Sequence, residues 1–349
     1  MRRKHFYILA FIVFGIASLA FVDGNKYWTI TTDDVKLDFP KNFPKPVYAF
    51  TDNIPTPAGF TLGRKLFYDP ILSKDSSISC GFCHQRIAAF SHFDHPISHG
   101  INGLLGKRNV PPLQNLIWQN AFMWDGGVNN LEVQPLAPMT NHVEMAEDVK
   151  HVVEKLQRNA KYRALFKDAF GDSIVTSKKL LKALAQFTGL MVSNNSRYDK
   201  FMRGEDTLSS DEARGLQLFR DKCAQCHKEP LFTDNTFRNV GLAYDSTFKD
   251  SGRVAITGNM KDFMKFKVPS LRNIEMTYPY MHDGRFHTLK QVLDRYTVKP
   301  TTIGTDPLLM NGIALTEQDK SDIIAFLKIL TDKTFLYDRR FADPNTQTR

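Results

Sequence analysis

The pattern of apolar and polar positions along the chain predicts helices joined by long loops, because strand signals are weak throughout. Residues 143–170 and 176–192 are both amphipathic at helical spacing. In the first stretch the charged residues share one face, and the apolar residues include Val152, Val153, Leu156 and Leu165. Residues 321–330, SDIIAFLKIL, show the same spacing and predict an amphipathic helix near the C-terminus.

Two helix starts are marked by capping boxes. Ser209-Ser-Asp-Glu212 opens a stretch that runs toward a pair of cysteines, and Thr316-Glu-Gln-Asp319 opens the C-terminal helix. These signals fix where the two helices should begin.

The first residues, MRRKHFYILAFIVFGIASLAFVDGN, are typical of an export signal. A cationic start precedes an apolar run from Phe6 to Val22, and Ser18 and Ala20 have the spacing that a signal peptidase needs. We therefore expect residues 1–22 to direct the protein to the periplasm. Because the run of about 17 residues is close to the lower limit for a bilayer span, an uncleaved membrane anchor is the alternative.

Composition and charge exclude few functions. The chain of 349 residues is 42% hydrophobic and 24% charged, as in an ordinary globular protein of one large or two medium domains. Loss of Arg2, Arg3 and Lys4 with the signal would lower the net charge from +9 to +6. The excess is dispersed and shows no basic run with interleaved aromatic residues, so no nucleic acid is expected as a partner. A solvated surface explains this charge, and the alternative is steering of a negatively charged protein partner.

All four cysteines lie in two copies of one motif, SCGFCH at 79–84 and KCAQCH at 222–227. A disulfide within either pair would be strained, although pairing between the motifs is conceivable. A four-thiolate zinc site would use both pairs but leaves the adjacent histidines unexplained. The string Cys-x-x-Cys-His is typical of covalent haem attachment, in which both sulfurs bind the vinyl groups and the imidazole binds the iron.

We therefore expect two covalently bound haem c groups. The residues that would hold haem one are Cys80, Cys83 and His84. The residues that would hold haem two are Cys223, Cys226 and His227. A haem also supplies an apolar centre around which irregular chain can pack, in agreement with the long loops.

The chain contains an internal duplication. Val110-Pro-Pro-Leu-Gln-Asn115 resembles Val268-Pro-Ser-Leu-Arg-Asn273, and Trp124-Asp-Gly-x4-Leu131 resembles His282-Asp-Gly-x4-Leu289, both with an offset of 158 residues. Upstream of the haem motifs, Gly63-x-x-Leu-Phe-x-Asp69 matches Gly215-x-x-Leu-Phe-x-Asp221. A constant offset indicates duplicated structure. The expected fold is therefore mainly α, with two cytochrome c-like haem domains and long irregular loops.

The two copies differ at positions that suit chemistry. The first copy has Glu132 after its Trp-Asp-Gly turn, whereas the second has Lys290 there and carries Tyr296 where the first has Pro138. A carboxylate at 132 could move protons over haem one, and a phenol at 296 could reach the iron of haem two. A surface glutamate and a core tyrosine are the alternatives.

Two Cys-x-x-Cys-His motifs, followed by FKVPSLRNIEMTYPYMHDGRFHTL, resemble the bacterial di-haem cytochrome c peroxidase and MauG family over residues 55–335. The resemblance implies a peroxidatic haem in an N-terminal domain, residues 50–205. It implies an electron-transfer haem in a C-terminal domain, residues 206–335, and a structural calcium ion between the two domains.

The resemblance also implies roles for individual residues. Glu132 falls on the acid/base glutamate of the family, beside the peroxidatic haem. Asn109 and the carbonyl groups of Thr277 and Pro279 match the calcium ligands, and oxygen atoms of this kind suit a hard cation. Solvated loop residues are the alternative for these three.

Other positions bear on the iron ligands. Tyr296 falls where the family places the distal ligand of haem two, methionine in the ordinary peroxidases and tyrosine in the MauG branch; Met276 and Met281 are alternative ligands. His99 lies near the histidine that many family members place on the distal face of haem one, with a histidine-rich surface loop as the competing interpretation.

Two departures weaken the transfer of roles. Phe122 replaces the usual glutamine that orients peroxide, and Trp118 is only an approximate counterpart of the tryptophan between the haems.

The function implied by the resemblance is that of a cytochrome c peroxidase. Such an enzyme reduces hydrogen peroxide to water with electrons from a small redox protein, a cytochrome c or a cupredoxin. One alternative is MauG-like, peroxide-dependent oxidation of a protein or organic substrate, and another is a di-haem electron carrier without catalysis. A homodimer would also fit the family.

Overall fold

The computed structural model describes residues 29–32 and 35–345, and within them the protein is mainly helical. The predicted export signal, residues 1–22, lies outside the described residues. The α-helices are α1 (Pro57–Tyr68), α2 (Cys80–Cys83), α3 (Leu136–Thr140), α4 (Val149–Arg158), α5 (Ala160–Phe170), α6 (Ser177–Gly189), α7 (Arg197–Met202), α8 (Ser210–Lys222), α9 (Val254–Thr257), α10 (Leu289–Thr297), α11 (Glu317–Lys328) and α12 (Lys333–Leu336). No described helix combines the length and the apolar composition that a bilayer span requires.

Strands and short 3-10 helices complete the fold. The part of the chain that the structure describes contains four strands in two antiparallel pairs, β1 (Thr29–Thr32) with β2 (Val35–Asp38) and β3 (Phe237–Arg238) with β4 (Phe266–Lys267). The 3-10 helices are η1 (Pro70–Leu72), η2 (Arg86–Ala88), η3 (Ile101–Gly103), η4 (Leu116–Trp118), η5 (Met260–Asp262), η6 (Ile274–Met276), η7 (Pro307–Leu309) and η8 (Arg339–Phe341). The small share of strand agrees with the weak strand signals in the sequence.

The capping signals explain where the helices begin. Ser209 and Thr316 each cap a helix in a complete capping box, and these are the two boxes predicted from the sequence. The amphipathic stretch 143–170 is not one helix: it divides into α4 and α5 at Asn159. The side chain of Asn159 accepts hydrogen bonds from the first backbone N–H groups of α5, so a new helix starts there.

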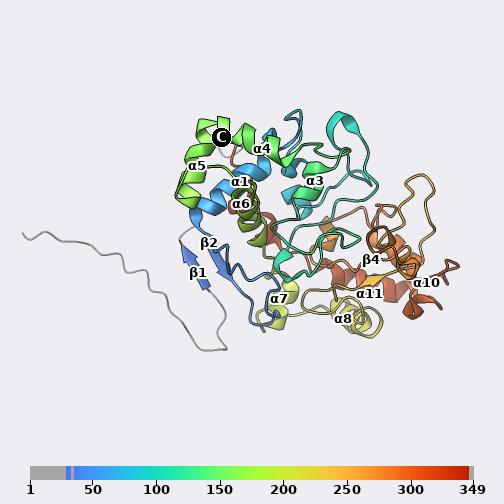
Figure 1. The fold of residues 1–349 in the computed structure, drawn as a ribbon. Helices are drawn as coiled ribbons and strands as arrows, with labels where there is room; N and C mark the ends of the chain where they lie inside the picture. The colour runs from blue at the N-terminus through green and yellow to red at the C-terminus, as the bar shows by residue number, and fades with distance from the viewer. Residues whose placement is uncertain (1–28, 33–34, 346–349) are drawn as a thin grey trace, which may run out of the picture.

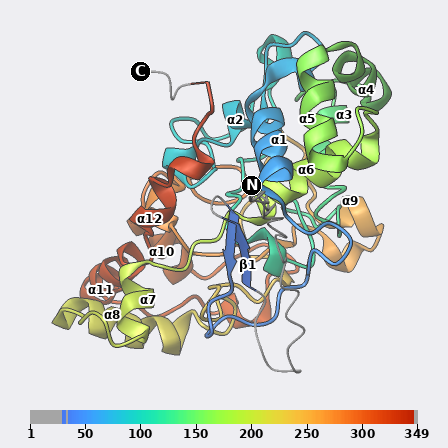
Figure 2. The ribbon, with the colours of Figure 1, turned by 90° about the vertical axis from the view of Figure 1, so that its left-hand side faces the viewer.

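Two hydrophobic cores lie in opposite parts of the molecule, and Figures 1 and 2 show their helices as separate groups. The N-terminal core packs α1 against α6, and the C-terminal core packs α8 against α11. After α11 the chain runs back to the N-terminal half, where Phe335, Leu336 and Phe341 pack in the N-terminal core. The fold prediction of two cytochrome c-like halves is confirmed, and the C-terminal segment ties the halves together.

The duplication seen in the sequence recurs in the backbone. Isolated β-bridges join Phe122 to Val128 and Tyr280 to Phe286, which are pairs separated by the same 158 residues. Asn115 and Asn273 both adopt left-handed backbone geometry, with φ of 59° and 58°, directly before a 3-10 helix. The repeated motifs therefore fold into the same local structures.

A glycine allows the helices to approach closely in each half. A Cβ atom at Gly63 would lie 2.0 Å from the carbonyl oxygen of Ala183, and one at Gly215 would lie 1.9 Å from that of Asp322. These two glycines are the first residues of the repeated motif found in the sequence.

We predict that Gly215→Ala lowers the free energy of unfolding by about 1–3 kcal/mol, because α8 and α11 must move apart. Helix propensity alone would raise the free energy of unfolding of the variant by about 0.5–1 kcal/mol. The sign of the measured change therefore shows whether the close packing of the helices or the helix propensity dominates. Urea unfolding of the haem-loaded protein measures it. Gln217→Ala, on the exposed side of α8, is the control and should change stability by less than about 0.5 kcal/mol. A more stable Gly215→Ala protein would contradict the packing.

Candidate functional site

The first Cys-x-x-Cys-His motif places its imidazole in a fixed orientation. Cys80–Cys83 form the short helix α2, and His84 ends it. Nδ1 of the His84 ring lies 2.7 Å from the carbonyl oxygen of Phe90. With Nδ1 donating to this carbonyl, Nε2 keeps its lone pair for a metal. Burial lowers the pKa of His84 to about 4, so the ring is neutral at physiological pH.

The second motif repeats this arrangement. Nδ1 of His227 lies 3.1 Å from the carbonyl oxygen of Phe232 and 3.2 Å from that of Pro269. Burial also lowers the pKa of His227. Phe90 and Phe232, which supply the carbonyl groups, both have positive φ angles of 60° and 55°. Both histidines are thus prepared in the same way to bind iron.

The cysteines are free thiols, so the conceivable disulfide between the motifs does not form in this structure. Cys80 packs against the N-terminal core and Cys223 against the C-terminal core, which separates the two pairs. Burial raises the pKa values of Cys80, Cys83 and Cys223 to about 12, so these thiols are protonated in the absence of a bound group. Among the described residues, no group containing cysteine is compact enough to hold a metal ion. The donor set fits covalent haem.

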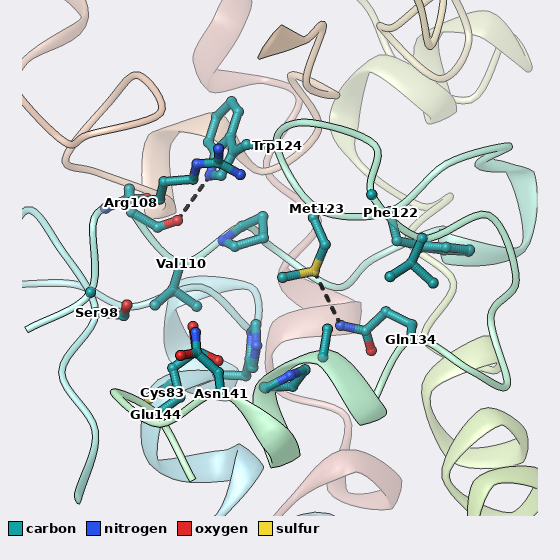
Figure 3. A pocket seen from close by; sticks show the side chains of 18 of the residues that line it. Cys83, Ser98, Arg108, Val110, Phe122, Met123, Trp124, Gln134, Asn141 and Glu144 are labelled. Carbon is teal, nitrogen blue, oxygen red and sulfur yellow. Dashed lines mark hydrogen bonds between the residues drawn. The ribbon is translucent and has the colours of Figure 1, made fainter. Parts of the chain in front are cut away.

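A cavity of about 760 Å³ adjoins the first motif, a size that suits a cofactor. Its lining includes Cys80, Cys83 and His84 together with Lys267 and Val268 from the second half of the chain. Figure 3 shows side chains converging on this space from several loops. The first haem motif therefore opens onto a chamber to which both halves contribute.

Met123, Gln134 and Phe122 form one side of this chamber. Nε2 of Gln134 donates to Sδ of Met123 at 3.7 Å (Figure 3). Phe122 also forms part of the lining. Gln134 thus supplies a side-chain amide to the cavity, a contribution that sequence reasoning missed.

Glu132 does not line this cavity in the structure. Its carboxylate accepts a hydrogen bond of 2.6 Å from the phenol of Tyr48. Burial, together with this bond, raises the pKa of Tyr48 above its ordinary value. Tyr48 therefore stays protonated and holds Glu132 outside the chamber.

Glu144 lines the cavity, together with Asp125 and Asp250, which are both ion-paired with Arg108. Figure 3 shows Glu144 and Asn141 beside Cys83. Burial raises the pKa of Glu144, which favours the protonated acid. Lys267 also lines the cavity, and burial lowers its pKa to about 7. Sequence reasoning missed both, because a lone Glu in HVEM and a Lys in FKVP gave no signal of burial.

Tyr296 lies on α10 close to the second haem motif. Burial, together with the nearby Cys223 and Cys226, raises its pKa to about 12. The electrostatic influence of both cysteines shows that the phenol is near the attachment site. Of the alternative ligands, Met276 packs against the N-terminal core instead.

Asn109 joins the two halves near the predicted calcium site. Its backbone N–H donates to the carbonyl of His282 at 2.7 Å, and its side chain donates to the carbonyl of Pro96 at 2.9 Å. Thr277 and Pro279 belong to the loop that leads to His282. The structure thus connects Asn109 with this loop through a backbone bond.

His99 and the tryptophans occupy distinct places. The ring of His99 stacks on that of His95, with a centroid distance of 4.6 Å. Trp118 is a core residue, since its Nε1 donates to the carbonyl of Pro44 at 2.7 Å. Trp124 instead lines the cavity, and its carbonyl accepts a bond of 2.7 Å from the N–H of Lys267 in the second half. Both described tryptophans thus contact the second half, since Nδ2 of Asn235 donates to the carbonyl of Trp118 at 3.3 Å.

Comparison with known proteins supports the same assignment of the two halves. The family profile described as di-haem cytochrome c peroxidase matches residues 57–207, and the cytochrome c profile matches residues 212–331. The methylamine utilization protein MauG of Methylophilus methylotrophus is 34% identical over 82% of this chain and 88% of its own length. The cytochrome c551 peroxidase of Nitrosomonas europaea is 35% identical over 77% of this chain and 79% of its own length.

A solved structure shares the fold as well as the sequence. The crystal structure of a MauG-like protein associated with microbial copper homeostasis superposes with a TM-score of 0.81 and 32% identity. The match covers 88% of this chain and 98% of that protein. Since the relatives match most of both chains at about a third identity, the chain belongs to the di-haem cytochrome c peroxidase and MauG family.

Proposed function

We propose that the protein is a di-haem c-type peroxidase that reduces hydrogen peroxide to water with electrons from a small redox protein. The observation that carries this proposal is the chamber beside His84, which adjoins one haem motif and receives side chains from both halves. The names of the relatives that are cytochrome c peroxidases agree with this activity.

Haem c, when bound, supplies a redox-active iron that reacts with peroxide and exchanges single electrons. The protein contributes the rest. His84 and His227 would bind the two irons through Nε2, because Nδ1 of each ring is occupied by a backbone carbonyl. Phe122, Met123 and Val110 would give the chamber a largely apolar wall and limit the access of water.

Proton transfer is assigned to Glu132, in accordance with the family resemblance. To act in the chamber its carboxylate must leave Tyr48, to which it is now bonded. Glu144 is the competing group, since it lines the cavity and burial raises its pKa. Either carboxyl group could protonate the departing oxygen atom of peroxide, so that water leaves rather than hydroxide.

Several finer features belong to the same proposal. A calcium ion would bind Asn109 and the carbonyl groups of Thr277 and Pro279, where a backbone bond between Asn109 and His282 brings the halves together. Four further predictions belong here: the domain limits 50–205 and 206–335, the periplasmic location, the export signal or anchor, and the homodimer. The electron donor would be a cytochrome c or a cupredoxin.

A second candidate function is supported by Tyr296. A tyrosine near the second haem motif is the feature that the MauG branch shares, and one relative is a MauG protein. In this alternative the two electrons that reduce peroxide come from a protein or organic substrate, which is oxidised, instead of from a cytochrome.

The first test separates these functions. We predict that the haem-loaded protein oxidises reduced cytochrome c rapidly, and only when hydrogen peroxide is present. The decay of the reduced cytochrome absorption band measures the rate. Peroxide consumption with no oxidation of cytochrome c, and with oxidation of an added protein substrate, would favour the MauG-like alternative. No reaction with peroxide at all would leave only an electron carrier.

The second prediction concerns the acid/base group. Glu132→Gln should lower kcat/KM for peroxide by about 10²–10⁴, because a general acid/base group is removed while both haems stay attached. Glu154→Gln, at an exposed position of α4, is the control for a lost surface carboxylate. If Glu144→Gln shows the large loss and Glu132→Gln is unchanged, the role belongs to Glu144.

The third prediction concerns Tyr296. Tyr296→Met should raise the reduction potential of haem two by on the order of 0.1 V, since axial ligands span about 0.8 V and methionine favours reduced iron. Spectroelectrochemical titration of the haem-loaded protein measures this potential. Tyr337→Phe, on the surface, should change nothing. An unaltered potential and spectrum in Tyr296→Met would show that Tyr296 is not a ligand.

A further inference from the structure

Three histidine side chains meet beside the first haem motif. His92, His95 and His99 each offer a ring nitrogen, and these three nitrogens lie within 4.8 Å of one another. The ring centroids of His92 and His95 are 4.0 Å apart, and those of His92 and His99 are 5.9 Å apart. Among the described residues, this is the one group of histidine, cysteine and acidic side chains compact enough to hold a metal ion.

Two nitrogens of the cluster are buried without any hydrogen-bond partner, Nδ1 of His92 and Nε2 of His95. Buried polar atoms nearly always have a hydrogen-bond partner, so two unpartnered nitrogen atoms in one cluster require an explanation. Nδ1 of His95 lies 2.7 Å from a carboxylate oxygen of Asp94. A carboxylate on one ring nitrogen, with the other nitrogen free, is the usual outer partner of a metal-bound histidine.

His92 is the buried member of the cluster, with 5% of its surface exposed. A metal ion binds an imidazole through the lone pair of its unprotonated nitrogen.

The backbone holds the cluster before any ion arrives. At the His92 end, the Ser91 hydroxyl donates to the carbonyl of Val110 at 2.6 Å. At the His99 end, the backbone N–H of Ser98 donates to the carbonyl of Arg108 at 3.0 Å. The backbone N–H of Gly100 donates to the carbonyl of Leu104 at 2.8 Å. Between them, the carbonyl of Pro96 accepts a bond from Asn109. A preorganised loop of this kind lowers the entropy lost on binding.

The geometry points to a mononuclear site for a divalent transition metal, Zn²⁺ or Cu²⁺, bound by His92, His95 and His99. Imidazole nitrogens suit both ions, whereas Ca²⁺ and Mg²⁺ require oxygen ligands. Three protein ligands leave one position open, for water or an outside ligand. His95 and His99 are partly exposed, which gives an ion a route to the site.

The site would lie against the wall of the haem-one cavity. The backbone carbonyl of His99 is 3.8 Å from Sγ of Cys83, and its ring contacts the edge of Phe82 within the haem motif. A bound ion would therefore fix the loop of residues 92–99 at this wall. It would also keep the ring of His99 in the cluster, so that this ring could not bind the haem iron.

Equilibrium dialysis of the full-length, haem-loaded protein against Zn²⁺ tests the proposal, with the two haem irons as an internal count. We expect one zinc per two irons by elemental analysis. Zinc binding should also leave the Soret band unchanged. His92→Gln and His95→Gln should each lose the stoichiometric zinc while keeping both haems.

Two further variants sharpen the test. Asp94→Asn keeps a residue that accepts the left-handed geometry at this position, where φ is 79°, and should weaken zinc binding by about 10- to 100-fold. His287→Gln, an exposed histidine elsewhere, should bind zinc as the unaltered protein does. The proposal is overturned if His95→Gln retains the zinc, if His287→Gln loses it too, or if zinc shifts the Soret band by taking His99 from iron.

Discussion

The hydrogen bond between a backbone carbonyl and Nδ1 of each haem-motif histidine is the constraint on which the rest of this structure depends. It selects one tautomer of His84 and of His227 and points Nε2 away from the chain. The carbonyl groups come from Phe90 and Phe232, whose positive φ angles turn the chain back under each ring.

The two halves share this support but not their surroundings. The first motif adjoins a chamber lined by residues of both halves, among them Glu144 and Lys267. The second motif has Tyr296 close to its cysteines, where a phenol could close the distal face. Backbone hydrogen bonds join the halves, from Lys267 to the carbonyl of Trp124 and from Asn109 to the carbonyl of His282. Under the proposed peroxidase function, the cavity beside the first motif would admit peroxide, and the second motif would serve electron transfer.

Much of this could be predicted from the sequence, because it depends on local signals. The haem motifs, the capping boxes at Ser209 and Thr316, and the repeated turns around Asn115 and Asn273 all depend on residues within a short stretch.

Side-chain orientation could not be predicted in the same way. Glu132 accepts a hydrogen bond from Tyr48, which is 84 residues away in the sequence, and no local sequence pattern predicts that partner. The burial of Glu144 and Lys267, and the meeting of His92, His95 and His99, likewise depend on how loops pack in three dimensions. The split of residues 143–170 into two helices was visible only in the capping role of Asn159.

The central claim is that this chain carries two covalent haems on two equivalent supports. Intact mass measurement, with peptide mapping, of protein matured in a host competent for cytochrome assembly tests it most directly. The account predicts two haems per chain, one on the peptide with Cys80 and Cys83 and one on that with Cys223 and Cys226. Free thiols at either pair, or a zinc ion shared by all four cysteines, would contradict it.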